Sequence, residues 1–274
     1  MKSEDRVVLI TGATDGLGKK LAKELAAHGA GVLLHGRNPE KAGRVIEEIT
    51  EATGNPKLAY YDADLSSLEE VRRMAGDIRS DQTHIDVLIN NVGIGPGRRG
   101  GARELSRDGC ELRFAVNYLS HFLLTHELMG LLQNAGRARI VNVASGAQQA
   151  IDFGDVMLEK GYDGRRAYSQ SKLAMVMFTF DLAEDLAETG ITANCLHPAT
   201  LMPTTMVMET DFFNTTVDSV KKGAEAVLRL AVSEETDGVS GEYFEGATPA
   251  TADAQAYDRQ ARNRLRRLSR DLVG

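Results

Sequence analysis

Val7-Val-Leu-Ile10-Thr-Gly12-Ala-Thr-Asp-Gly16-Leu-Gly18 stands near the start of the 274-residue chain and decides its fold. Residues 7–10 form a short apolar run rich in β-branched side chains, which is typical of a strand buried on both faces. The glycine-rich turn leads into a helical pattern of Leu21, Leu25 and alanines that ends at Gly29. Strand, turn and helix in this order predict the first unit of a doubly wound parallel sheet.

The turn itself indicates a phosphate site. Backbone N–H groups at a helix N-terminus, together with the helix dipole, favour an anionic group such as a pyrophosphate. The common dinucleotide fingerprint is G-x-G-x-x-G, whereas this turn is spaced G-x-x-x-G-x-G, so Thr14 and Leu17 occupy two of the fingerprint's glycine positions. A plain tight βα loop could have the same composition, and both interpretations stay open at this point.

The alternation of strand and helix continues along the chain. Further strands are predicted at 31–35, 57–61, 85–89, 139–143, 190–196 and 241–245. Helices are predicted at 39–53, after Ser66 or Ser67, over 111–128, around Tyr168 to 188, at 221–232 and from about 253. This pattern predicts an α/β fold, a single Rossmann-type doubly wound parallel sheet of about seven strands in the order 3-2-1-4-5-6-7 with helices on both faces. No repeat or break in composition divides residues 1–274, which are expected to form one domain.

Polar residues gather where these strands end. Ligands of doubly wound sheets bind at the carboxyl ends of the strands, so these residues predict one binding edge. They are Arg37 and Asn38 after the second strand, Asp64 and Leu65 after the third, Asn90-Asn91-Val92-Gly93 after the fourth, Ser145 after the fifth, and His197-Pro198-Ala199-Thr200 after the sixth.

The end of the second strand indicates which dinucleotide is bound. An NAD site usually has an acidic residue about 20 positions after the glycine turn, where it holds the ribose 2′-hydroxyl. This chain has none before Glu40, and Arg37 stands there instead. Because a guanidinium pairs well with phosphate, NADP(H) is predicted over NAD(H). Lys19 either adds to this positive field or is simply solvated.

Tyr168-Ser-Gln-Ser-Lys172 places a phenol and an ammonium on one face of a helix, one turn apart. A free tyrosine has a pKa of about 10, and a nearby cation favours the phenolate, so the pair is a candidate general acid and base. The same spacing describes an ordinary half-exposed helix turn, although only this one of the seven tyrosines has Lys four positions later. Asn117 is a poor helix-interior residue, so it either faces solvent or has a local role.

Composition excludes several classes of function. A net charge of −7 and a pI near 5.5 argue against nucleic acid or anionic membranes as the main partner. Six arginines between Arg259 and Arg270 are interpreted as a solvated helix face. Cys110 and Cys195 make no disulfide framework, which fits a reducing compartment. No apolar run approaches the roughly 18 residues that cross a bilayer, the polar N-terminus leaves no room for a signal peptide, and no metal site is predicted. We expect a soluble cytoplasmic protein.

Three segments are expected to form the walls of a substrate pocket: 93–103, 146–165 and 200–218. The first carries Arg98 and Arg99 and is interpreted as an access loop, an anion contact or, preferably, a plain surface loop. The third contains Met202, Met206 and Met208, which suit an adaptable apolar wall. His197 is interpreted as structural.

Taken in order, these motifs resemble those of the short-chain dehydrogenase/reductase family over essentially the whole chain. The matching motifs are Thr11-Gly-x-x-x-Gly-x-Gly18, Asp64-Leu65, Asn90-Asn91-x-Gly93, Asn117, Ser145, Tyr168-x-x-x-Lys172 and His197-Pro198. Residues 112–122 (Leu-Arg-Phe-Ala-Val-Asn-Tyr-Leu-Ser-His-Phe) and the Gly-Glu-Tyr-Phe segment look like the retinol dehydrogenase and WW-domain oxidoreductase branch.

The resemblance implies a catalytic role for four residues. Tyr168 would exchange a proton with the substrate oxygen, and Ser145 would hold and polarise that oxygen. Lys172 would lower the pKa of Tyr168 and hydrogen-bond the nicotinamide ribose, while Asn117 would position a water that links Lys172 to solvent. The cofactor carries the hydride. The implied function is NADP(H)-dependent interconversion of a ketone or aldehyde and an alcohol, on a small molecule of moderate size and apolar character. The alternative is a non-catalytic NADP-binding sensor or scaffold.

The resemblance also implies the cofactor contacts. Gly12, Gly16 and Gly18 would seat the pyrophosphate, Asp64 would bind the adenine amino group, and Asn91 would hold the backbone near the adenine ribose. The remaining expected contacts come from Thr14, Asp15, Leu17, Arg37, Asn38, Leu65, Gly93, Tyr168, Lys172, Pro198 and Thr200.

Three departures from the family pattern matter. Val92 stands in place of the usual Ala, and Ala199 in place of the Gly that usually follows Pro198. The gap from Ser145 to Tyr168 is longer than the shortest family spacing, which implies an insertion at 146–165. That insertion can cap the pocket or block a helix-pairing interface, so homo-oligomerisation stays open.

Overall fold

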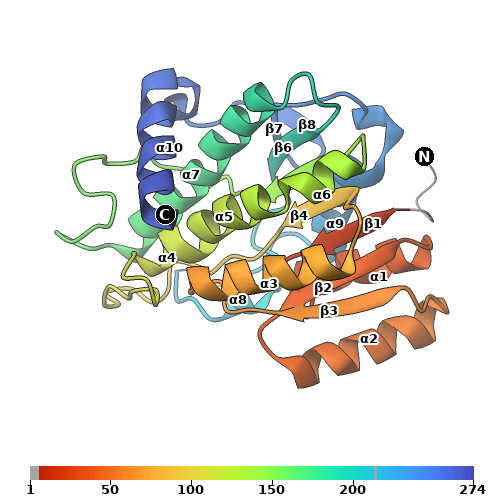
Figure 1. Cartoon of the computed structure of the whole chain (residues 1–274). Helices are drawn as coiled ribbons and strands as arrows, with labels where there is room; N and C mark the ends of the chain where they lie inside the picture. The colour runs from red at the N-terminus through yellow and green to blue at the C-terminus, as the bar shows by residue number, and fades with distance from the viewer. Residues whose placement is uncertain (1–5, 213–214) are drawn as a thin grey trace.

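An eight-stranded sheet forms the centre of the computed structural model, which describes residues 6–212 and 215–274 (Figure 1). Its strands lie in the order β3-β2-β1-β4-β5-β6-β7-β8, and every neighbouring pair is parallel except β7 and β8. The strands are β1 (Val7–Ile10), β2 (Gly31–Gly36), β3 (Leu58–Asp62), β4 (Val87–Asn90), β5 (Arg139–Val143), β6 (Thr192–His197), β7 (Tyr243–Glu245) and β8 (Thr248–Ala250).

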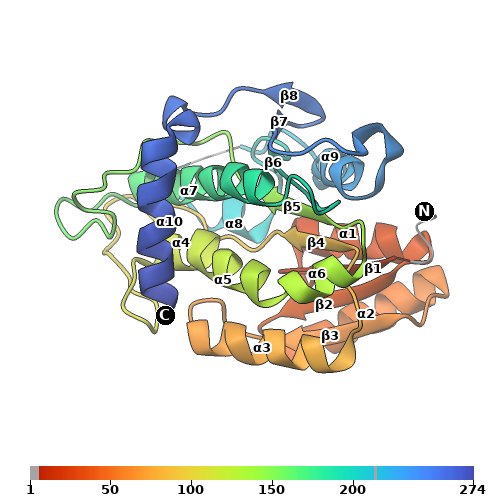
Figure 2. The same cartoon turned by 45° about the horizontal axis from the view of Figure 1, so that its top comes forward.

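Helices cover both faces of this sheet (Figure 2). One face carries α1 (Gly16–Ala27), α2 (Pro39–Thr53) and α9 (Val220–Val232). The other carries α3 (Leu68–Asp81), α4 (Leu112–Phe114), a π-helical segment (Ala115–Leu119), α5 (Ser120–Glu127), α6 (Met129–Asn134) and α7 (Gly164–Asp185). Short α8 (Thr205–Met208) lies in the segment after β6, and 3₁₀ turns span Glu234–Thr236 and Ala254–Tyr257. Helix α10 (Arg259–Val273) packs on α7.

The central strands are apolar on both faces because both faces are covered. Val8 and Ile10 of β1 lie in the apolar layer beneath α1, whereas Leu9 lies in the layer beneath α3, α5 and α7. This alternation follows from the period of two along a strand. It fixes the register of β1, because a slip of one residue would exchange the two layers.

The predicted Rossmann-type fold and strand order are confirmed, with an eighth strand added. β8 has only three residues and includes Pro249, so periodicity gave no signal for it. Proline is tolerated there because β8 is an edge strand, where one row of backbone groups needs no partner.

The interpretation of the C-terminal arginines as a solvated face is only partly right. Arg262 is 5% exposed and pairs with Asp181 and Glu184 of α7 at 3.1 and 2.6 Å. Arg266 contacts Asp181 and Asp185, so these cations bind α10 to α7. Among the described residues, no helix is both long and apolar enough to span a bilayer.

Candidate active site

The glycine-rich turn between β1 and α1 is tight enough to require glycine. Gly12 and Gly16 have φ of +69° and +47°, in the left-handed region that side chains disfavour. A Cβ on Gly18 would lie 2.0 Å from the carbonyl oxygen of Gly12. Helix α1 starts directly at this turn, where the Asp15 carboxylate accepts a hydrogen bond from the Gly16 N–H.

His35 of β2 holds this turn in place, and the sequence analysis missed it. Its Nδ1 accepts a hydrogen bond from the Gly12 N–H at 3.1 Å, while its Nε2 lies 3.0 Å from the carbonyl oxygen of Ala63. The two contacts together require a neutral ring with the proton on Nε2. Burial lowers the pKa of His35 to about 4, which keeps the ring neutral. The signal in the sequence is a histidine inside an otherwise apolar buried strand.

Thr11 and Asn91 join the ends of β1 and β4. The Asn91 amide donates to the carbonyl oxygen of Thr11 at 2.8 Å, and the Thr11 hydroxyl accepts from the backbone N–H groups of Asn91 and Val92. Asn91 also lies against Gly12 and Gly18. The predicted role of Asn91 in holding the backbone fits this geometry.

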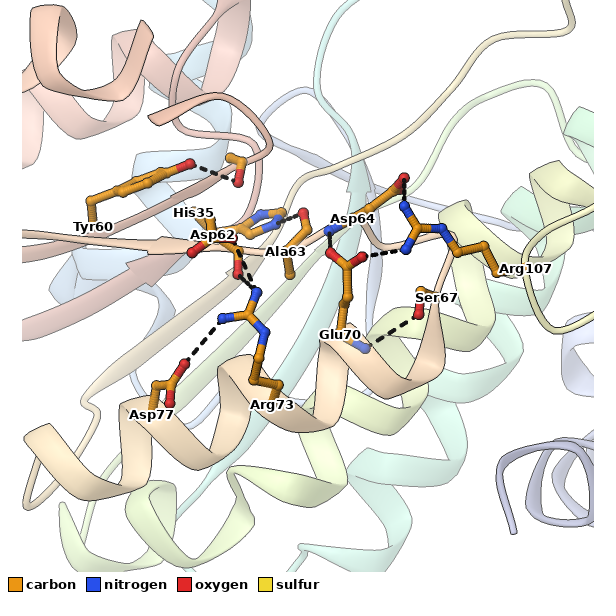
Figure 3. A network of polar contacts seen from close by, with 11 residues as sticks. His35, Tyr60, Asp62, Ala63, Asp64, Ser67, Glu70, Arg73, Asp77 and Arg107 are labelled. Carbon is orange, nitrogen blue, oxygen red and sulfur yellow. Dashed lines mark hydrogen bonds and ion pairs between the residues drawn. The ribbon is translucent and has the colours of Figure 1, made fainter. Parts of the chain in front are cut away.

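A polar network closes the edge of the site beyond β3 (Figure 3). Asp64 accepts a hydrogen bond from the Ser66 N–H at 3.0 Å, and Arg107 approaches its carboxylate at 3.8 Å. Glu70 of α3 accepts from the Asp64 N–H at 2.6 Å and from Arg107 at 2.6 Å. Arg107 is a further residue that the sequence analysis did not single out. Leu65 is buried beneath this network.

Several predicted cofactor contacts have side chains that already bind within the protein. Asn38 caps α2 by accepting from the Lys41 N–H, and Asp15 pairs with the Lys41 ammonium at 2.6 Å. Lys19 pairs with Glu48 at 2.6 Å instead of standing free in solvent or at the site. Thr14 packs against Gly36.

Arg37 differs from these residues. It is exposed at the carboxyl end of β2 and has no ion-pair or hydrogen-bond partner within residues 6–212 and 215–274. A glycine cradle at a helix N-terminus, with a spare guanidinium at the next strand, fits a phosphorylated dinucleotide.

Ser145, Tyr168 and Lys172 come together at the carboxyl end of β5. The Lys172 ammonium is buried and donates a hydrogen bond to the carbonyl oxygen of Val143 at 2.9 Å. It lies 5.9 Å from the centroid of the Tyr168 ring. The Ser145 side chain lies within hydrogen-bonding reach of the Tyr168 phenol.

Asn117 is buried, so it does not face solvent and has a local role instead. It lies in the π-helical segment, and its amide oxygen accepts from the Ile94 N–H at 2.7 Å. Its amide nitrogen donates to the Ile94 carbonyl oxygen at 3.1 Å and to the Ser171 hydroxyl at 2.9 Å. Gly93 lies between this amide and Lys172, since a Cβ there would be 3.5 Å from Asn117 Oδ1 and 3.1 Å from Lys172 Nζ. Four predicted catalytic residues therefore meet at one place.

The pKa values of this group are set mainly by burial. Burial lowers the pKa of Lys172 to about 8. It raises the pKa of Tyr168 above its usual value, and the hydrogen bond with Ser145 offsets this only in part. The net shift of Tyr168 is opposite to the lowering that the family resemblance implies, because a buried phenolate is costly.

The segment after β6 forms the outer wall of the site. Thr204 packs on Gly16, Thr205 donates to the Asp15 carboxylate at 3.1 Å, and Met206 packs on Gly93 and Gly95. Of the three methionines expected in the pocket wall, only Met206 lies there. Met202 packs against Gly223 of α9, and Met208 is 69% exposed.

The start of this segment contains two of the predicted cofactor contacts. Pro198 is buried, and Thr200 is exposed with its hydroxyl 3.1 Å from the His197 ring.

The three segments predicted as pocket walls contact one another. Gly164 packs so closely on the Pro96 carbonyl that a Cβ would lie 2.1 Å from its oxygen. Thr210 donates to the carbonyl oxygen of Gly97 at 2.8 Å, which joins the loop after β4 to the segment after β6. The stretch 146–163 contains no helix or strand, and it contacts the loop before α4 through a hydrogen bond from Arg103 to the Met157 carbonyl oxygen.

Comparisons with known proteins agree with this architecture. The family model described as short chain dehydrogenase matches residues 6–213. The chain is 35% identical to retinol dehydrogenase 13 of Mus musculus over 285 residues, covering 98% of this chain and 84% of the relative. A solved structure of an uncharacterised protein from Mycobacterium paratuberculosis superposes with a TM-score of 0.79 at 28% identity, over 98% of this chain and 93% of that one. A second, described as a short chain dehydrogenase from Escherichia coli CFT073 complexed with NADPH, has a TM-score of 0.73 at 25% identity, over 90% and 99%.

Proposed function

The chain belongs to the short chain dehydrogenase family, in its retinol dehydrogenase-like branch, and we propose that it interconverts a ketone or aldehyde and the corresponding alcohol with NADP(H). One observation carries the proposal. Ser145, Tyr168, Lys172 and Asn117 come from the loop after β5, from α7 and from the π-helical segment, and they meet at the edge of the sheet that also holds the glycine turn.

Tyr168 is the proton donor in the direction of carbonyl reduction. Because burial raises the pKa of its phenol, the group stays protonated at neutral pH, which is the state that a general acid requires. The bound nicotinamide supplies the hydride for this reaction. Ser145 lies next to the phenol, so both hydroxyl groups can hydrogen-bond one carbonyl oxygen and stabilise the charge that develops on it.

Lys172 and Asn117 support this pair. Lys172 loses its proton readily for a lysine, since burial lowers its pKa to about 8, and it is therefore suited to return a proton toward Tyr168. The side-chain amide of Asn117 accepts from the Ile94 N–H and donates to the Ile94 carbonyl oxygen. These two hydrogen bonds keep the loop after β4 against Lys172. Asn117 is buried in the π-helical segment, a local departure from regular α-helix that is frequent at functional sites.

The glycine turn, Asn91 and Arg37 are proposed to hold the cofactor. Gly12, Gly16 and Gly18 keep side chains out of the turn at the start of α1, where the helix dipole favours a pyrophosphate. Arg37 is the spare cation that would pair with the 2′-phosphate of NADP(H). The NADPH complex of the Escherichia coli CFT073 relative supports this choice.

The test is oxidation of NADPH, followed by its absorbance, across a panel of ketones and aldehydes. Turnover of at least one carbonyl class is expected, with NADH much less effective at equal concentration. No turnover across the panel, with NADPH binding intact, would instead support a non-catalytic NADP-binding sensor.

A further inference from the structure

We propose that the carbonyl substrate carries a carboxylate, which Arg165 and Arg99 bind about one helical turn from Tyr168. The inference rests on the proposed oxidoreductase function and names the class of substrate that it acts on. It modifies the expectation of a substrate of apolar character.

A cleft of about 440 Å³ opens beside the candidate catalytic residues. Its walls are residues 146–149 on one side and Asp163, Arg165, Arg166 and Ser169 on the other. Gly146 directly follows Ser145 in the chain, and Ser169 directly follows Tyr168, so the backbone of the cleft walls is continuous with both candidate catalytic residues. Polar side chains predominate in these walls, which suits a charged group better than a hydrocarbon.

Arg165 is well placed to contact a substrate held by Tyr168. It precedes Tyr168 by three residues on α7, so the two side chains project from the same face of the helix. Three residues of α-helix span about 4.5 Å along the axis. A substrate whose carboxylate lies a few bonds from its carbonyl carbon can therefore reach both groups.

A second guanidinium contacts the same aromatic ring as Arg165. Arg99 and Arg165 lie 5.3 and 5.6 Å from the centroid of Phe212, within the range of a cation–π contact. The backbone N–H of Arg99 also donates to the Asp211 carboxylate at 2.8 Å. The two cations come from different segments of the chain, and Phe212 fixes both before any ligand binds, which lowers the entropic cost of binding.

Both guanidinium groups keep their hydrogen-bonding capacity. Neither Arg99 nor Arg165 pairs with a carboxylate among the residues that the structure describes. The nearby carboxylates already have partners, since Asp152 pairs with Arg166 at 2.9 Å and Asp163 accepts from the Arg166 N–H at 2.8 Å. A guanidinium offers a planar fork of N–H donors, which matches the two oxygens of a carboxylate. Arg98 and Arg99 were interpreted mainly as a plain surface loop, and this geometry assigns Arg99 to an anion contact.

The experiment compares 4-carboxybenzaldehyde with its methyl ester, methyl 4-formylbenzoate, as substrates for NADPH-dependent reduction. The two aldehydes share one reacting group and differ in charge. For the wild-type protein we expect kcat/KM to be at least about tenfold higher for the acid, because charge-assisted hydrogen bonds to a carboxylate are strong. Arg165→Gln should remove most of this preference by raising KM for the acid, and Arg165→Lys should retain part of it.

Arg267→Gln is the matched control. Arg267 is exposed on α10 without a partner among the described residues, so the variant removes the same charge away from the cleft. It should keep the preference for the acid. An equal kcat/KM for acid and ester in the wild type, or an unchanged ratio in Arg165→Gln, would overturn the anion site while leaving the oxidoreductase function standing.

A binding measurement separates the two proposals. Titration calorimetry with 4-carboxybenzyl alcohol should show tighter binding to the wild type than to Arg165→Gln, about tenfold or more. Tighter binding to the wild type without turnover of any carbonyl would contradict the proposed function and support the anion site. An equal affinity for both proteins would contradict the anion site whatever the activity.

Discussion

Lys172 donates its hydrogen bond to the backbone carbonyl oxygen of Val143, at 2.9 Å, and not to the phenol of Tyr168. The ammonium is therefore anchored to the last residue of β5, one residue before the loop that carries Ser145. This contact fixes the position of Lys172, while burial lowers its pKa to about 8.

The buried ammonium predicts a characteristic dependence of stability on pH. Between about pH 8 and 10.5 the unfolded chain binds a proton at Lys172 that the folded chain does not, so the free energy of unfolding rises with pH. The rise is about 3.5 kcal/mol in total, at roughly 1.4 kcal/mol per unit of pKa shift. Lys172→Met should lack this contribution. Urea unfolding of both proteins at pH 8 and pH 10 measures the difference, and parallel pH dependences would show that Lys172 titrates normally.

Gly18 predicts a sharp steric effect at the cofactor turn. A Cβ there would meet the Gly12 carbonyl oxygen at 2.0 Å, so Gly18→Ala must displace the turn. We expect a loss of about 1–3 kcal/mol in stability and a clear loss of NADPH affinity. The control is Gly43→Ala in α2, where a Cβ has open space and should stabilise the helix by up to about 1 kcal/mol. Thermal unfolding and fluorescence titration with NADPH give both quantities, and equal behaviour of the two variants would contradict the account of the turn.

The sequence predicts most elements of this fold but not all of them. The buried strands β1 and β4 and the helix at 39–53 were predictable because apolar period and turn residues agree there. The strand β8 was not, since three residues with a central Pro249 and no buried side chain have no periodic signal. The role of Arg262 was also hidden, because its partners Asp181 and Glu184 are far away in the chain.

In the candidate site, too, some features could be predicted from the sequence and others depend on the three-dimensional structure. Position beyond a strand end was enough to place Ser145 at the binding edge, and the family resemblance added Tyr168 and Lys172. The local role of Asn117 depends on the π-helical segment, which a period of 3.6 residues does not reveal. His35 escaped notice because its partner, the Gly12 N–H, is set by the packing of β2 against the turn. The upward pKa shift of Tyr168 needs burial, and burial cannot be read from residue types alone.

Arg37 predicts the choice of cofactor. If it pairs with a 2′-phosphate, Arg37→Ala should weaken NADPH binding by about 10- to 100-fold and leave NADH binding nearly unchanged. Arg44→Ala serves as the control, because Arg44 is exposed on α2 with no partner in the described part of the chain. Fluorescence titration with both cofactors measures the effect. Tighter binding of NADH than NADPH by the wild type would refute the assignment.

Tyr168→Phe tests the central claim most directly, because it removes one hydroxyl group from the site and nothing else. The measurement is single-turnover reduction of 4-carboxybenzaldehyde, or of the best substrate in the carbonyl panel, with NADPH affinity determined on the same sample. A positioned general acid accelerates a reaction roughly 100- to 10,000-fold, so we expect the rate of reduction to fall by at least about 100-fold. The affinity for NADPH should change by less than about twofold. A variant that binds NADPH normally and reduces the carbonyl at the wild-type rate would contradict the assignment of Tyr168 as the proton donor.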